Sequence, residues 1–155
     1  MRVLGDLSRL GAQRTPAKLA LLADAGSLSY GAIDHASNQL AHALLAAGVA
    51  PGDRIGLIAH NHPAYVIPAQ AAAKIGAIIV PLNHRYTAAE LAGPLAQAQP
   101  AFLVYDPALE DVVMAALATL PVPPRRLYLL PGPKRDVPDV EAFARGQPTD
   151  SPGIA

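Results

Sequence analysis

One arginine, Arg85, combines a side chain suited to phosphate binding with a position where ligands often bind. It follows the apolar stretch 77–82, which has the composition of a buried strand, and α/β proteins usually bind ligands in the loops after parallel strands. A guanidinium group presents a fixed fork of donors that matches phosphate oxygens. The alternative role for Arg85 is a salt bridge to Glu90 or a contact with the following helix. Asn83 is interpreted as a residue that turns the backbone.

The five histidines form two pairs that invite a test for metal binding. His35 and His42 are seven residues apart, so two helical turns would place them on one face. His60 and His62 flank Asn61. A zinc site needs three or four ligands, and nothing in the sequence indicates that the two pairs converge. We therefore interpret these histidines as surface or capping residues and expect no metal site.

Several motifs of self-contained catalytic sites are absent from the sequence. It contains no Gly-x-x-x-x-Gly-Lys-Ser/Thr loop, no Gly-x-Gly-x-x-Gly after any expected strand and no Gly-x-Ser-x-Gly elbow. A nucleotide site of the two common types and a hydrolase site are therefore not expected. Arg54, at the start of an apolar stretch, is interpreted as a surface ion pair or turn contact. No catalytic residue is assigned.

The composition is that of a globular protein without a nucleic-acid partner. Of the 155 residues, 52% are hydrophobic and 15% are charged, which favours a packed core over disorder. The formal net charge is zero and there are no cysteines, so a basic face and disulfides are not expected. The start of the chain lacks the apolar core of a signal peptide, and no apolar run reaches about 18 residues. We expect a cytoplasmic protein without a membrane span.

Hydrophobic periodicity predicts alternating strands and helices. Thr87 and Glu90 have the spacing of a capping box, and Gly48 occupies a position that favours a left-handed helix end. An amphipathic helix is expected over 1–13, and His60 or Asn61 is expected to cap the helix that ends near 75. Further helices are expected over 33–47, 87–98 and 107–120, and strands over 18–23, 27–30, 54–59, 77–82, 101–105 and 126–130.

This alternation predicts an α/β fold with a mainly parallel, doubly wound sheet flanked by helices. Residues 1–130 are expected to form the α/β subdomain. Residues 131–155 are rich in proline and glycine, with a weak helical period only at 140–144. We expect this second part to be mostly ordered loop that needs the remainder of a larger protein to pack against.

Residues 29–106 carry the strongest functional signal. Four pieces of this stretch resemble the start of the adenylate-forming superfamily of acyl- and aryl-CoA ligases. They are SY at 29–30, GVAPGDR at 48–54, GA at 76–77 with VPLN at 80–83, and R at 85 leading into TAAEL at 87–91. The chain would then be the N-terminal subdomain of a larger adenylate-forming enzyme.

The resemblance implies a reaction, its cofactors and its partners. The complete enzyme would use ATP and Mg to join a carboxylic acid to AMP, and would then transfer the acyl group to CoA. Its phosphate loop, adenine-binding segment, ribose-binding aspartate and C-terminal lysine belong to segments that this sequence lacks. The partners of the chain would be the remainder of the enzyme, the acid and CoA. Some members carry a basic residue near the CoA nucleotide at the position of Arg85, which implies that Arg85 contacts a CoA phosphate.

Three functions remain open from the sequence. The first is an N-terminal fragment of an acid–CoA ligase, active in fatty acid metabolism or a related pathway and inert by itself. The second is a binding or scaffolding module that kept the fold and lost the chemistry. The third, a stand-alone nucleotide-binding protein, is opposed by the missing glycine motifs.

Overall fold

A four-stranded parallel sheet forms the centre of the protein. The computed structural model describes residues 4–134 and 136–153. The strand order is β4-β3-β5-β6, and every neighbouring pair is parallel. The predicted α/β fold with a parallel sheet is confirmed. The strands are β3 (Arg54–Ile58), β4 (Ile78–Pro81), β5 (Phe102–Tyr105) and β6 (Arg125–Tyr128).

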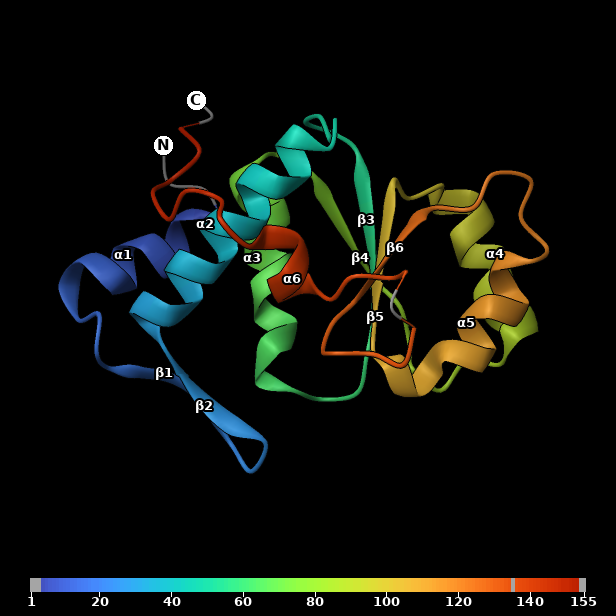
Figure 1. Cartoon of the computed structure of the whole chain (residues 1–155), viewed down its shortest axis with the longest axis horizontal. Helices are drawn as coiled ribbons and strands as arrows, with labels where there is room; N and C mark the ends of the chain where they lie inside the picture. Colours follow the sequence, from blue (N-terminus) through green and yellow to red (C-terminus); the bar gives the residue numbers. More distant parts are fainter. Residues whose placement is uncertain (1–3, 135, 154–155) are drawn as a thin grey trace.

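Helices cover both faces of this sheet, as a doubly wound fold requires (Figure 1). Side chains of one strand alternate between the two helical layers. Leu57 and Val104 pack toward the layer of α2, α3 and α6, whereas Ile58 and Tyr105 pack toward α4 and α5. The helices are α2 (Tyr30–Ala46), α3 (Val66–Lys74), α4 (Ala88–Ala98), α5 (Glu110–Leu117) and α6 (Val140–Ala144). Within the described ranges, none is both long and apolar enough to cross a membrane.

The chain begins with a helix and a hairpin that stand beside the sheet (Figure 1). They are α1 (Asp6–Arg14) and the antiparallel pair β1 (Leu19–Ala23) and β2 (Gly26–Ser29). The predicted helix over 1–13 is shifted, and residues 1–3 lie outside the described part. Its amphipathic pattern is also wrong in detail, because Leu4 and Leu7 are exposed while Ser8 is buried.

A close helix contact explains the burial on α1. A Cβ atom placed on Gly11 would lie 2.2 Å from Cδ1 of Tyr30, so only glycine lets α1 lie this close to the start of α2. The small and polar face of α1 therefore packs inward, with Ser8 buried, while Leu7 remains exposed and Leu10 is only partly buried.

Helix starts follow local hydrogen-bond rules, with one correction. Thr87 and Glu90 form the predicted capping box at α4. The cap before α3 is His62, whose Nδ1 accepts a hydrogen bond from the Ala64 backbone, and neither His60 nor Asn61 serves as the cap. A 3-10 turn, η1 (Pro63–Tyr65), separates this cap from α3. Pro63 suits the first position of this turn because its missing N–H is not needed there, and α3 itself begins at Val66.

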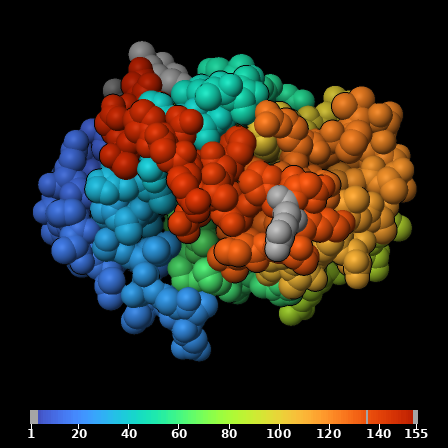
Figure 2. Space-filling model, viewed as in Figure 1, coloured from blue at the N-terminus to red at the C-terminus, as the bar shows by residue number. Residues whose placement is uncertain are grey.

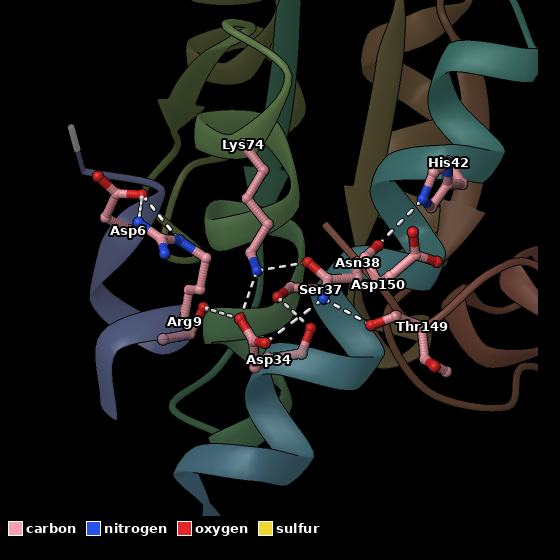
Figure 3. A network of polar contacts seen from close by, with 10 residues as sticks. Asp6, Arg9, Asp34, Ser37, Asn38, His42, Lys74, Thr149 and Asp150 are labelled. Carbon is pink, nitrogen blue, oxygen red and sulfur yellow. Dashed lines mark hydrogen bonds and ion pairs between the residues drawn. The ribbon is translucent and has the colours of Figure 1, made fainter. Parts of the chain in front are cut away.

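A buried polar network joins three helices (Figure 3). The Lys74 ammonium lies 2.6 Å from Asp34 Oδ1 and 2.5 Å from Asn38 Oδ1. The Ser8 hydroxyl donates to the same Asp34 oxygen at 3.1 Å. The side chains of Lys74 and Asp34 are only 4% and 11% exposed. This ion pair therefore lies in the interior between α1, α2 and α3.

The C-terminal segment makes hydrogen bonds to α2 of this chain, and the expectation that it also needs other parts of a larger protein stays a prediction. Asn38 Nδ2 donates to the Thr149 carbonyl at 2.7 Å, and Gln39 donates to the Gln147 carbonyl at 3.1 Å. Val140 of α6 is buried. Figure 2 shows the red segment lying across the surface of α2. The boundary near residue 130 stays a prediction.

A carboxylate also anchors the segment after β6. Glu110 Oε2 accepts hydrogen bonds from the hydroxyls of Tyr105 at 2.6 Å and Tyr128 at 2.9 Å. Lys134 forms an ion pair with the other oxygen. Partial burial acts to raise the pKa of Glu110, but the hydrogen bonds from Lys134, Tyr105 and Tyr128 together hold it below its usual value. Gly132 lies against the ring of Tyr128, where a Cβ would come within 2.1 Å.

The first prediction concerns the buried ion pair. Asp34→Ala should lower the free energy of unfolding by about 3–5 kcal/mol, because it leaves the Lys74 ammonium buried and unpaired. Arg9→Ala is the matched control, since the Arg9–Asp6 pair on α1 has a more exposed cation and should contribute about 0–1 kcal/mol. Urea unfolding of both variants measures this difference. Equal losses would contradict a special role for Asp34.

The second prediction concerns the acid side of the stability curve. Because the folded pKa of Glu110 is lowered, its contribution to stability is present above the unfolded pKa of about 4.3 and is lost as pH falls through the folded value. Glu110→Gln should therefore flatten the fall of the urea midpoint below about pH 5. Asp111→Asn, at the next and exposed position of α5, should leave that fall unchanged. Parallel curves for Glu110→Gln and the native chain would refute the assignment.

Candidate functional site

The carboxyl edge of the sheet contains a topological switch point. The chain leaves β3 toward α3 on one face, whereas it leaves the neighbouring β5 toward α5 on the opposite face. In Figure 1 this edge lies at the bottom of the sheet, where the loop between β3 and α3 runs. Open α/β sheets bind ligands in the crevice between two such strands.

A histidine and an aspartate meet across this crevice. His60 Nδ1 lies 2.7 Å from Asp106 Oδ2. The Asp106 backbone N–H donates to the Ile58 carbonyl at 3.0 Å, so the β3–β5 ladder continues up to the pair. Asp106 Oδ1 accepts from the Ala108 backbone at 2.9 Å and thereby caps η2 (Pro107–Leu109). Both carboxylate oxygens are therefore engaged.

The environment of Asp106 favours its charged form. Partial burial acts to raise the pKa of Asp106, but the hydrogen bonds from the Ala108 backbone and from His60 together hold it below its usual value. The Asp106 side chain is 17% exposed and that of His60 is 52% exposed. An ionised carboxylate beside Nδ1 selects the His60 tautomer that carries a proton on Nδ1.

A second histidine brings the loop after β4 to the same place. The ring of His84 lies 4.8 Å from that of His60, measured between centroids, at an angle of 48°. Side chains from the loops after β3, β4 and β5 thus come together at one edge.

Arg85 follows His84 and is exposed. Asn83 Oδ1 accepts a hydrogen bond from the Arg85 backbone at 3.0 Å, which confirms that Asn83 turns the chain. The Glu90 carboxylate is engaged by Thr87, through its backbone at 2.8 Å and its hydroxyl at 2.9 Å. Among the described residues, no ion pair joins Arg85 to Glu90. The guanidinium group is left open to solvent.

Arg54 has a structural role at the opposite edge of the sheet. Its Nε donates to the Ala98 carbonyl at 2.8 Å, and its terminal nitrogen donates to the Gln99 carbonyl at 3.1 Å. A cation at these last carbonyls of α4 also complements the helix dipole. Nη1 of Arg54 donates to the Gly52 carbonyl at 3.4 Å, which confirms the expected turn contact.

The histidines lie in the kinds of position that the sequence predicted, on the surface or at a helix cap. His42 Nε2 lies 3.1 Å from the Asp150 carbonyl, and His35 is exposed on α2. His62 caps η1, while His60 faces Asp106 and His84. Across 4–134 and 136–153, no group of three or more histidine, aspartate or glutamate side chains could hold a metal ion.

Asp106 is the site residue that the sequence analysis missed as a partner of His60. A signal for it was present, because both residues closely follow apolar stretches that become neighbouring parallel strands. The strand order decides which of these ends meet, and the sequence pattern does not contain that order.

Comparison with known proteins identifies the family. The family described as AMP-binding enzyme matches residues 9–149. Feruloyl-CoA synthase from Amycolatopsis sp is 34% identical over 138 residues, which make up 89% of this chain and 27% of that protein. A medium/long-chain-fatty-acid and 3-oxocholest-4-en-26-oate CoA ligase from Mycolicibacterium smegmatis is 30% identical over 118 residues, or 76% of this chain and 21% of that protein.

Solved structures agree at the level of the fold. The long-chain-fatty-acid-CoA ligase FadD1 from Archaeoglobus fulgidus superposes with a TM-score of 0.86 at 21% identity, covering 99% of this chain and 32% of that one. This chain spans about a quarter of the length of the curated relatives it matches. Since the family match covers most of its length, the chain belongs to the family of AMP-binding enzymes.

Proposed function

We propose that this chain is the amino-terminal part of an ATP-dependent acid–CoA ligase that acts in the cytoplasm. The complete enzyme forms an acyl-AMP from a carboxylic acid and ATP, and then transfers the acyl group to CoA. The observation that carries this proposal is the 34% identity to feruloyl-CoA synthase over 89% of the chain. Because the relatives are about four times as long, the activity belongs to the longer protein.

The contribution of this segment is to bind CoA. The two relatives described above are named for very different acids, an aromatic acid in one and fatty or steroid acids in the other. CoA is common to both names, and both share this segment. We therefore assign contacts in this segment to the binding of CoA and not to the selection of the carboxylic acid.

Arg85 is the residue that we assign to a CoA phosphate. It is exposed, it is free of Glu90, and its loop is held by the Asn83 hydrogen bond. A guanidinium group in this state offers several unused donors, which fit phosphate oxygens. ATP and Mg complete the cofactors of the ligase, and Mg supplies charge neutralisation at the triphosphate when bound. We assign no residue of this chain to ATP or Mg.

The third prediction is that residues 1–155 alone are inactive. They should not catalyse acid-dependent exchange of pyrophosphate into ATP, because adenylation needs donors and a metal positioned around the triphosphate and the chain has no glycine-rich donor loop. A panel of aromatic and fatty acids covers the substrate range, and the full-length ligase is the positive control. Exchange that copurifies with the short chain would oppose the proposal that the activity needs the longer protein.

The fourth prediction tests Arg85 in the full-length ligase. Loss of a charge-assisted contact of about 1.5–3 kcal/mol should raise the KM for CoA by roughly ten- to a hundredfold in Arg85→Ala. Acyl-AMP formation should be unchanged, because CoA takes no part in it. Arg14→Ala, at the end of α1, is the matched control and should alter neither step. An unchanged KM for CoA in Arg85→Ala would remove Arg85 from the site.

A further inference from the structure

His60 has one ring nitrogen committed and one free. Nδ1 is held by Asp106 at 2.7 Å, and among the described residues no hydrogen bond to Nε2 is present. The ring is half exposed at the switch-point crevice, and the His84 ring lies against it. Arg85 is the next residue along that loop. The free nitrogen therefore lies at the same edge as the open guanidinium.

We propose that His60, positioned by Asp106, is a second contact for the phosphate that Arg85 binds, and that this contact forms only when the imidazole is protonated. This inference rests on the proposed function. The inference adds His60, which follows a different strand from Arg85, and it adds a dependence of phosphate binding on pH. The ligand class is a phosphate monoester of the kind present on the nucleotide end of CoA.

The fixed tautomer is the reason for the dependence on protonation. Because Nδ1 carries a proton toward Asp106, the neutral ring presents a lone pair at Nε2. A lone pair cannot donate to a phosphate oxygen. The imidazolium ion donates from both nitrogens, so it can bond to Asp106 and to phosphate at the same time. Binding of the proton and binding of the phosphate therefore assist each other.

The surrounding charges allow this state. Asp106 balances one positive charge on His60, and hydrogen bonds from Ala108 and His60 keep its carboxylate ionised. His84 is the titratable group packed against the ring, Arg85 adjoins it, and His62 is on the same loop with Nδ1 engaged by the Ala64 backbone. With His60 protonated, Asp106, His60 and Arg85 together carry one net positive charge. This arrangement favours an anion over a cation.

Binding of adenosine 3′,5′-bisphosphate to the 155-residue chain, measured by calorimetry at pH 6 and pH 8, tests the inference. Histidine is the side chain whose charge ordinarily changes within the physiological range of pH. His60→Gln should weaken binding about five- to tenfold at pH 6, the loss expected for one charge-assisted hydrogen bond, and should leave binding at pH 8 unchanged. Asp106→Asn should instead narrow the difference between the two pH values, because without the carboxylate the neutral ring can carry its proton on Nε2 and donate to phosphate. His35→Gln, an exposed histidine on α2, should match the native chain at both values.

The outcomes separate this inference from the Arg85 assignment. Arg85→Ala should weaken binding at both pH values, because guanidinium stays charged throughout. An equal effect of His60→Gln at pH 6 and pH 8, or no effect at pH 6, would overturn the role of His60 and leave Arg85 standing. If Arg85→Ala has no effect while His60→Gln loses binding only at pH 6, the Arg85 assignment is overturned and the role of His60 stands. Absence of binding by the native chain at both values would overturn both.

Discussion

The buried ammonium of Lys74 imposes the strongest constraint on this structure. Taking such a charge out of water costs several kcal/mol, and only correctly placed oxygens offset that cost. Here the oxygens belong to Asp34 and Asn38 on α2, and Ser8 of α1 donates to the same carboxylate. Asn38 extends the network to the Thr149 carbonyl. Three helices and the C-terminal segment must therefore be in place together, which makes this layer one cooperative unit (Figure 3).

The placement of Lys74 also fixes α3, and α3 begins near the carboxyl edge of the sheet. Lys74 lies at the last turn of that helix, and the loop that carries His60 leads into its beginning. On the other face, α5 is entered through the turn that Asp106 caps. The bond between His60 and Asp106 thus joins the entrances of helices from opposite layers. A side chain between two fixed layers has little freedom to lose on binding, and such preorganisation favours affinity.

Signals that act over a few residues were predictable from the sequence. The Thr87–Glu90 capping box and the left-handed Gly48, with φ of 91°, follow from local hydrogen bonding and backbone sterics. The alternation of apolar strands with helices likewise predicted the parallel sheet. Contacts between distant segments were not predictable. The pairing of His60 with Asp106 needs the strand order, and the packing of the C-terminal segment on α2 depends on carbonyl groups that any sequence possesses.

The two basic groups at the carboxyl edge differ in a way that matters for binding an anion. Arg85 is charged at every physiological pH and is held only through its backbone, so its side chain must be ordered when a ligand binds. His60 is already oriented by a carboxylate, but its charge depends on a proton. Arg85 therefore attracts an anion at all these pH values but loses side-chain entropy when it binds. His60 is already oriented for binding but must first take up a proton. They belong to loops that follow neighbouring parallel strands, β3 and β4, at the same edge of the sheet.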